Sequence, residues 1–139
     1  MYIIQRLFFF WVVFFVLLIT GCSSYDSNEK QVIVIQEYAD LDGGKYRDLE
    51  NITDIDQVQQ VREIVRDAKW EEKLVNMGRP ADYRFTFQFE NADIEAKPVL
   101  HELWISASSE KAEMIRGDIE YSRLNEKDTA ALIEVLTGN

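Results

Sequence analysis

The residues from Tyr83 to Glu90 read YRFTFQFE, and their alternation constrains the fold more than any other feature of the chain. Aromatic residues occupy every second position, and polar residues occupy the positions between them. A period of two places the rings on one face of a β-strand and the polar side chains on the other. Strands with one apolar and one polar face are typical of antiparallel sheets, so the sequence predicts such a sheet with its aromatic face covered.

Two further extended segments precede this strand. Residues 31–39, QVIVIQEYA, are rich in valine and isoleucine, which is typical of a strand. The sequence Asp42-Gly43-Gly44 follows, and Asp-Gly between two extended segments predicts a hairpin because the turn needs positive φ angles. The return strand is expected at about residues 46–51.

The segment between these strands and the aromatic strand has a helical pattern. We expect Thr53 to cap the helix, with Asp56 at the capping-box spacing, and the helix to end at about Lys69. Trp70 is expected to pack back under its end. The apolar positions recur at spacings of three and four and therefore share one helix face: Val58, Val61, Ile64, Val65 and Ala68.

Two more strands are expected after the aromatic strand, at residues 99–106 (VLHELWIS) and 112–121 (AEMIRGDIEY). In the first of them Trp104 lies on one face and His101 on the other. We expect one of these faces to be covered by a helix or by a partner. The other members of the two faces are Leu100, Glu102 and Ser106 beside Trp104, and Leu103 and Ile105 beside His101.

A second helix is predicted at the end of the chain. Asn125 is expected to cap it, with Asp128 at the capping-box spacing, and Gly138 is expected to end it. Its apolar face consists of Ala131, Leu132, Val135 and Leu136. The predicted order is β-β-α-β-β-β-α, an α+β fold in which two helices pack on one face of an antiparallel sheet, as a two-layer sandwich.

The N-terminus has a different composition from the rest of the chain. Thirteen consecutive apolar residues run from Leu7 to Ile19, and Arg6 precedes them. A membrane-spanning helix needs about 20 apolar residues, whereas the hydrophobic region of a signal peptide is shorter. We therefore predict a signal peptide at residues 1–21; a retained transmembrane anchor and an ordinary secretory signal are the alternatives.

The only cysteine of the chain, Cys22, directly follows this segment. Ile19-Thr20-Gly21-Cys22 resembles the bacterial lipobox, in which the signal peptide is cut between Gly21 and Cys22. The resemblance implies an S-diacylglycerol group on Cys22 and an N-linked acyl chain such as palmitate, which together suffice for stable anchoring. Residues 22–30 would then be the lipidated cysteine and a flexible tether, and residues 31–139 a single domain.

Charge excludes several classes of partner. Residues 22–139 hold 14 basic and 25 acidic side chains, so the sequence argues against nucleic acid and against electrostatic adhesion to anionic lipid. With a single cysteine, an intrachain disulfide cannot form and a thiolate metal cluster is excluded. We expect attachment to the membrane to depend on the N-terminus alone.

Few residues indicate chemistry, and we predict no catalytic residues, no metal and no cofactor. His101 is the only histidine and is expected to be a core or edge residue rather than a catalytic one. Asp40 and Asp42 are interpreted as part of the hairpin. A calcium loop that begins at Asp40 would have an oxygen ligand at its fifth position and glycine at its sixth, whereas here glycine occupies the fourth and fifth positions. Tryptophans that could stack on a glycan are Trp70 and Trp104, and carboxylates that could form a glycosidase-like pair are Glu71, Glu72, Glu90 and Glu102.

The chain resembles a family of small, uncharacterised Gram-positive lipoproteins, the YhfM-like proteins. The resemblance spans most of residues 31–136 and depends on short elements at packing and capping positions. This chain departs from the family at one point: the family has proline closely followed by Asp-Tyr, whereas here Ala81 intervenes. It implies a location at the cell surface but no activity and no site residues. The elements are Ala68-Lys69-Trp70, Pro80 with Tyr83 and Phe85, Leu103-Trp104-Ile105, and Tyr121 with Leu124.

From the sequence we expect a lipid-anchored protein on the extracytoplasmic face of the cell membrane. Its domain is expected to bind another envelope component, most simply a protein, through a sheet face or edge. The alternatives are a sensor of cell-wall fragments or small ligands, which would use the aromatic residues, and a small envelope enzyme or enzyme accessory.

Overall fold

The computed structural model describes residues 29–139. The predicted signal peptide, Gly21 and Cys22 lie outside the described residues, as does most of the predicted tether. Neither helix of residues 29–139 is long and apolar enough to cross a membrane. The described part of the chain forms one seven-stranded sheet with two α-helices.

The strands pair in the order β2-β1-β4-β5-β6-β7-β3, and every neighbouring pair is antiparallel. The predicted antiparallel sheet and the α+β class are therefore confirmed. The bounds of the strands are β1 Gln31–Ala39, β2 Lys45–Asp48, β3 Glu71–Glu72, β4 Tyr83–Phe89, β5 His101–Ile105, β6 Ala112–Arg116 and β7 Glu120–Leu124.

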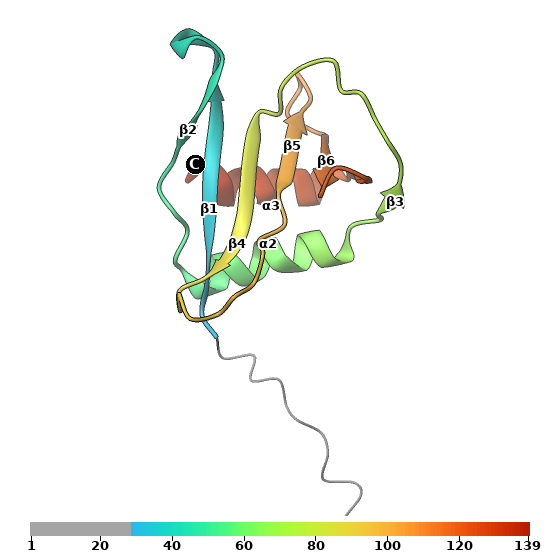
Figure 1. Ribbon diagram of the computed structural model, residues 1–139. Helices are drawn as coiled ribbons and strands as arrows, with labels where there is room; N and C mark the ends of the chain where they lie inside the picture. The colour runs from blue at the N-terminus through green and yellow to red at the C-terminus, as the bar shows by residue number, and fades with distance from the viewer. Residues whose placement is uncertain (1–28) are drawn as a thin grey trace, which may run out of the picture.

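The hairpin between β1 and β2 forms where Asp42-Gly43-Gly44 predicts it. A short 3-10 turn, η1 (Asp40–Asp42), precedes Gly43 and Gly44, whose φ angles are 78° and 73°. Such angles are readily adopted only by glycine, which explains why the turn falls at this point in the sequence. Figure 1 shows this hairpin projecting at the end of the molecule opposite the start of β1.

Helix α2 (Ile55–Asp67) is capped by Asp54, whose side chain accepts a hydrogen bond from the Gln57 backbone N–H at 2.9 Å. The predicted cap, Thr53, is therefore one residue too early, because the chain offers two adjacent capping side chains and the carboxylate is used. The Trp70 indole donates to the Val65 carbonyl at 2.8 Å and so packs back under the helix end, as predicted.

Helix α3 (Glu126–Thr137) begins and ends as the sequence predicts. The Asn125 side chain accepts a hydrogen bond from the Asp128 backbone N–H at 2.8 Å. At the other end Gly138 adopts a left-handed conformation with φ 72°.

The main hydrophobic core is a single cluster to which both helices and the central strands contribute. The side chains that alternate inward from the central strands meet Val58, Val61 and Ile64 of α2 and Leu132 of α3 in a single cluster. In Figure 1 both helices are drawn behind the strands. The inward-facing core residues of the sheet include Ile33, Ile35, Phe85, Leu103, Met114 and Leu124.

The expectation of three strands between the helices is wrong in two places. Residues 112–121 form not one strand but two, β6 and β7, because Gly117 and Asp118 adopt positive φ angles of 58° and 69° and reverse the chain. The segment after α2, expected to be a connection, contributes the short strand β3, which pairs with Glu120 and Tyr121 of β7. The observed order is thus β-β-α-β-β-β-β-β-α.

The opposite face of the sheet is partly covered by irregular chain. A second, smaller cluster of buried residues lies there, formed by Trp104, Ile115 and Tyr121 with Ala81. Val75 and Met77 pack against it from the connection between β3 and β4. A loop therefore covers Trp104, whereas Leu103 beside it in β5 points to the helices.

Candidate functional site

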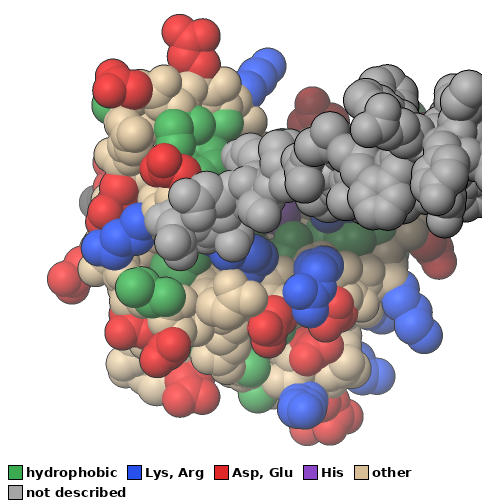
Figure 2. Space-filling view, turned by 90° about the horizontal axis from the view of Figure 1, so that it is seen from below, with side chains coloured by type: hydrophobic (Ala, Val, Ile, Leu, Met, Phe, Trp, Pro, Cys, Tyr) green, Lys and Arg blue, Asp and Glu red, His purple; other side chains and the backbone are tan. Residues whose placement is uncertain are grey.

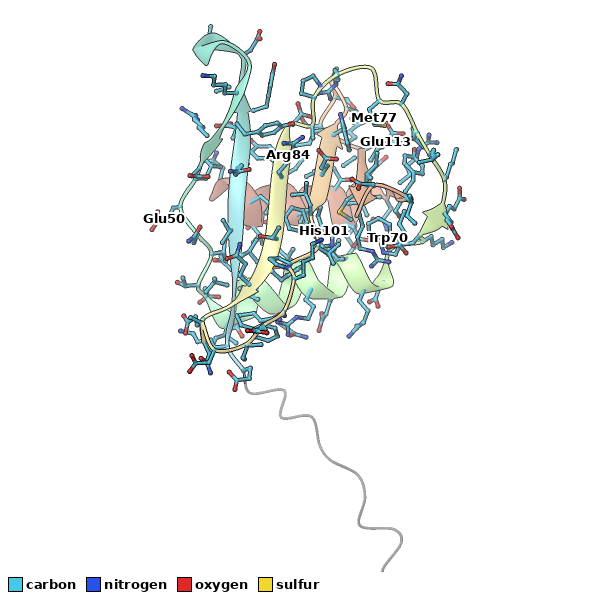
Figure 3. All side chains as sticks on the ribbon, viewed as in Figure 1. Glu50, Trp70, Met77, Arg84, His101 and Glu113 are labelled. Carbon is cyan, nitrogen blue, oxygen red and sulfur yellow. The ribbon has the colours of Figure 1, made fainter. Side chains whose placement is uncertain are left out.

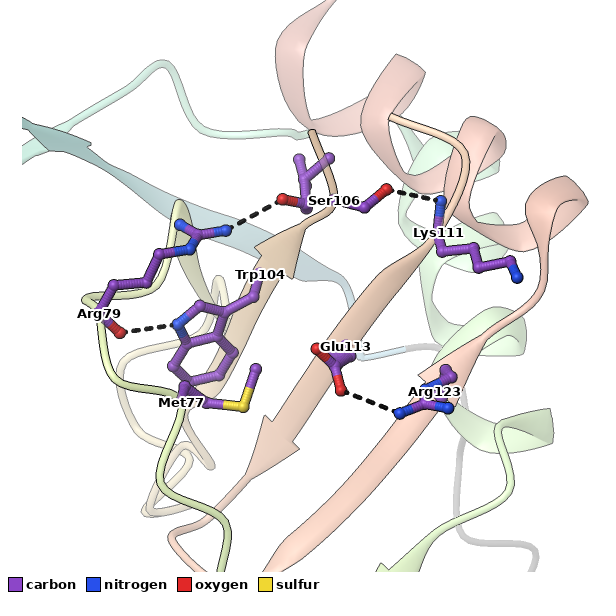
Figure 4. A pocket seen from close by; sticks show the side chains of 8 residues that line it. Met77, Arg79, Trp104, Ser106, Lys111, Glu113 and Arg123 are labelled. Atoms are coloured by element: carbon purple, nitrogen blue, oxygen red, sulfur yellow. Dashed lines mark hydrogen bonds and ion pairs between the residues drawn. The ribbon is translucent and has the colours of Figure 1, made fainter. Parts of the chain in front are cut away.

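A pocket of about 340 Å³ opens on the face that carries Trp104, between the sheet and the connection from β3 to β4 (Figure 4). Its floor is a row across three strands, because Trp104 pairs with Glu113 and Glu113 pairs with Arg123. The volume lies in the range of small-molecule sites. The pocket is lined by Met77, Arg79, Trp104, Ile105, Ser106, Lys111, Glu113 and Arg123.

Hydrogen bonds between side chains and backbone hold one wall of the pocket. The Trp104 indole N–H donates to the Arg79 carbonyl at 2.9 Å, and the Arg79 guanidinium donates to the Ile105 carbonyl at 3.0 Å. Asp82 accepts from Arg79 at 2.7 Å and from the Ile105 backbone N–H at 2.6 Å. These bonds fix the loop to the end of β5 without regular secondary structure.

The β5–β6 turn forms the second wall and carries Lys111. The Ser106 backbone N–H donates to the Lys111 carbonyl at 2.9 Å, and the Lys111 backbone N–H donates to the Ser106 hydroxyl at 3.2 Å. The turn is thereby closed while the lysine side chain stays exposed. Among residues 29–139, the Lys111 ammonium forms no ion pair.

The other charges of the pocket are partly neutralised by one another. Glu113 accepts a hydrogen bond from the Tyr121 hydroxyl and lies 3.4 Å from the Arg123 guanidinium. Burial, reinforced by Glu113, raises the pKa of Tyr121, so the phenol stays a donor at neutral pH. The hydrogen bond with Asp82 raises the pKa of the Arg79 guanidinium, which holds that charge firmly.

Chemically, the pocket presents cationic donors around an apolar wall. Three of its lining side chains are cationic and one, Glu113, is anionic. This sign is opposite to that of the whole chain, whose net charge is −10. The indole of Trp104 and the side chain of Met77 supply the apolar part (Figure 4).

A second hollow of about 310 Å³ shares Ile105 and Ser106 with this pocket. Its remaining lining residues include two carboxylates, Glu37 and Asp82. Burial raises the pKa of the Tyr83 phenol there, and Glu37 adds to the effect. The two hollows therefore differ in the charged side chains that line them, and Asp82 of the second pairs with Arg79 of the first at 2.7 Å.

His101 is a core residue, as the sequence predicts. It is 4% exposed, stacks on Phe85 with ring centroids 4.9 Å apart, and meets Phe87 edge-on at 5.7 Å. Burial, and to a lesser extent the nearby Arg116, lowers its pKa to about 4, while the Phe85 and Val99 backbones oppose the shift weakly. Neither ring nitrogen has a well-formed hydrogen-bond partner among the described residues.

The four carboxylates considered for a catalytic pair occupy three separate places in the fold. Glu102 lies in β5 and pairs with Arg84 at 2.8 Å, while Glu90 follows β4 and pairs with Lys30 at 3.0 Å. Glu71 and Glu72 form the exposed edge strand β3. Within residues 29–139, no cluster of three or more potential metal ligands occurs.

Asp40 and the backbone of Asp42 belong to the hairpin turn, as interpreted from the sequence. Trp104 and Glu113 contribute to the pocket, whereas Trp70 packs under α2 beneath the Arg116 guanidinium, at 4.2 Å from its ring centroid. Sequence reasoning noted Trp104 but missed Arg79, Lys111, Glu113 and Arg123. The alternation of β7 places Arg123 on the same face of the sheet as Tyr121. The sequence around Arg79 and Lys111 has no pattern that predicts their position at the pocket.

Comparison with known proteins identifies the family. The family described as YhfM protein matches residues 26–139, which include the whole described domain. No curated protein and no solved structure matches the chain. The match covers well over half of the sequence and includes every strand and helix described above, and the chain therefore belongs to the YhfM family.

Proposed function

We propose that this protein is a lipid-anchored, non-enzymatic binding protein on the extracytoplasmic face of the cell membrane. Its domain binds an envelope component through the face of the sheet that carries Trp104. The observation that carries the proposal is the pocket beside Trp104, in which cationic side chains and an aromatic ring surround a hollow.

The location rests on the N-terminal sequence. The apolar segment from Leu7 to Ile19 has the length of a signal-peptide hydrophobic region, and Gly21-Cys22 supplies the cleavage point and the thiol for lipid. The short polar segment up to Lys30 would hold the domain within roughly 30 Å of the bilayer surface.

The arrangement of the sheet supports the choice of binding surface. β1 begins at Gln31, where the tether joins the domain, and runs toward the end of the sheet where Glu37 pairs with Tyr83 and Tyr83 with Leu103. The pocket lies at that same distant end, where Figure 3 shows Met77 and Glu113. A tethered domain would thus present the pocket away from the membrane.

The part of the opposite end that is visible in Figure 2 has a different arrangement of charge. Figure 2 views the molecule from the end at which β1 begins, and on the face visible there acidic and basic side chains are interspersed. Interspersed charges give solubility without a field of one sign. This contrast supports the pocket end as the binding end.

The partner is proposed to be an envelope protein, with a small ligand or a cell-wall fragment as the second candidate. The second candidate is favoured by the pocket itself, because a hollow with an aromatic wall and a few charged groups is typical of small-molecule sites. His101, the residue type most used in acid–base catalysis, is buried in the core instead of lining the pocket, which supports binding over catalysis.

In-cell photo-crosslinking tests the binding surface. A photoreactive amino acid replaces Ser106 at the pocket, and in a matched control it replaces Gln60, which is exposed on α2. We expect a specific adduct from position 106 and none from position 60. The same adducts from both positions, or none from either, would overturn the proposed surface.

The anchor has its own test. Membrane fractions are compared for the wild-type protein and for Cys22→Ala, and the mature wild-type mass is measured. We expect the mature protein to carry the mass of a diacylglyceryl group and the variant to lose it. An unmodified wild-type cysteine would refute the lipid anchor and leave the binding surface to be judged by crosslinking.

A further inference from the structure

We infer that the pocket beside Trp104 binds an oxyanion, a carboxylate or phosphate group, on a small organic ligand with an apolar portion. The inference rests on the proposed binding function and names the chemical class of its ligand. Lys111 would be the principal cationic contact, Arg79 and Arg123 would add to the field, and Trp104 and Met77 would contact the apolar portion.

The distribution of charge gives the first argument. The lining side chains carry three positive charges and one negative charge, in a chain with ten more acidic than basic residues. A random sample of this surface would be acidic, so the pocket concentrates the minority charge. An excess of one sign in a cleft raises the local concentration of ligands with the opposite sign.

The availability of donors gives the second argument. The Arg79 guanidinium is occupied by Asp82 at 2.7 Å and by the Ile105 carbonyl at 3.0 Å, so it supplies charge more than free N–H groups. Arg123 has only long contacts of 3.4 Å, to Glu113 and to the Tyr121 hydroxyl. Lys111 has no ion-pair partner within the described domain, and its three N–H donors suit an oxyanion.

The state of Glu113 gives the third argument. Its carboxylate lies on the pocket floor but already accepts from the Tyr121 hydroxyl and contacts Arg123. A cationic ligand would have to compete with these partners and would meet three positive side chains on the way. An anionic ligand would be attracted by these positive side chains and opposed less strongly by Glu113, whose charge Arg123 partly neutralises at 3.4 Å; the attraction would strengthen as water is displaced.

The apolar wall of the pocket indicates what the uncharged portion of the ligand is. Trp104 is 7% exposed and its indole N–H is already bonded to Arg79, so its ring edge offers contact rather than a hydrogen bond. Met77 is a flexible apolar group that adapts to different shapes. A volume of about 340 Å³ admits a ligand of small-metabolite size or the end of a longer chain.

Nuclear magnetic resonance titration of the full-length protein in non-ionic detergent micelles tests the inference. Four one-ring probes share a phenyl group and differ in charge: phenyl phosphate, benzoate, benzyl alcohol and benzylamine. The Trp104 indole N–H and the Lys111 amide report binding at the pocket, and the Trp70 indole serves as an internal control. We expect saturable shifts at Trp104 with one or both anions, at least tenfold tighter than with benzyl alcohol.

Matched variants then test the role of the lysine. Lys111→Gln should weaken the binding of the anions by about five- to tenfold, because one charge-assisted contact is lost. Lys127→Gln removes the same charge from an exposed site on α3 and should leave the affinity unchanged. An equal loss in both variants would show general electrostatic attraction and overturn the site.

The outcomes separate this inference from the proposed function. If benzyl alcohol binds at Trp104 as tightly as the anions, the pocket does not select ligands by charge. In that case the oxyanion inference fails and the proposed binding function stands. If no probe shifts Trp104 while crosslinking at position 106 succeeds, the surface binds a partner but the oxyanion inference again fails. The ratio between phenyl phosphate and benzoate tells the two sources of negative charge apart.

Discussion

The buried His101 makes the stability of the domain depend on pH between about 4 and 6.5. Its pKa is lowered from the ordinary value of 6.5 to about 4, chiefly by burial and then by Arg116. Because the folded-state pKa lies below the unfolded-state value, the unfolded chain binds the extra proton. The contribution is fully present above pH 6.5 and is lost as the pH falls toward 4.

The magnitude follows from these two values. At about pH 5 the unfolded chain is almost fully protonated at His101 and the folded chain is almost fully neutral, so linkage predicts a loss of about 2 kcal/mol relative to about pH 7.5. This is a large share of the stability of a small domain. Carboxylates with lowered pKa values, such as Glu120, titrate at lower pH and add little within this window.

Urea denaturation of residues 29–139 at several pH values measures the effect. The wild-type domain should lose about 2 kcal/mol between about pH 7.5 and pH 5, and His101→Leu should lose almost nothing over the same range. The leucine variant also replaces a ring whose nitrogens lack partners with an apolar side chain, so it should not be less stable at neutral pH. Equal losses of stability in both proteins would refute the reasoning. A second test follows the imidazole resonance of the folded domain by nuclear magnetic resonance, which is unambiguous because the chain has one histidine. A titration near pH 6.5 would also refute the reasoning.

Four further predictions concern single substitutions. Phe85→Ala should lower the free energy of unfolding by about 3–5 kcal/mol in urea denaturation, because the ring is 1% exposed at the centre of the core; a loss below 1 kcal/mol would contradict the packing. Asp54→Ala should cost about 1 kcal/mol by the same measurement, whereas Thr53→Ala should cost less if the cap is as described. Gly44→Ala should destabilise the hairpin, because a Cβ would lie 2.8 Å from the Tyr38 hydroxyl at a φ of 73°; unchanged amide shifts in the hairpin would argue against this. Glu113→Gln should tighten phenyl phosphate binding severalfold in the titration, since it removes the one negative charge of the pocket, and weaker binding would contradict the charge argument.

Elements with strong local patterns were predictable from the sequence. The alternation of β4, the Asp-Gly turn and the Asn125 cap are each specified within a few residues, and the structure forms them where expected. The β6–β7 hairpin had a local signal too, since Gly117-Asp118 between two extended segments is typical of a tight turn, but an unbroken strand was predicted.

Other features depend on contacts between distant residues and have no local signal. β3 has only two residues, Glu71 and Glu72, and exists as a strand because β7 offers an edge for it to pair with. Likewise Arg79 reaches the pocket because Asp82 bonds to the Ile105 backbone N–H, across 23 positions of sequence. Charged residues in irregular segments carry no periodicity, so their convergence could not be read in advance.

The position of the pocket follows from the way each face of the sheet is covered. A helix satisfies its own backbone hydrogen bonds, so α2 and α3 can pack apolar side chains into the main core. The loop that covers Trp104 does not satisfy its own backbone groups, so side chains do so. The Trp104 indole donates to the Arg79 carbonyl and the Arg79 guanidinium donates to the Ile105 carbonyl. Asp82 accepts from the Ile105 backbone N–H. As a result, the charged side chains of Arg79 and Asp82 lie beside the apolar ring of Trp104, next to the β5–β6 turn that carries Lys111. Function would then arise where the sheet is covered by loop, because fixed charges and the Trp104 ring share one opening to solvent there.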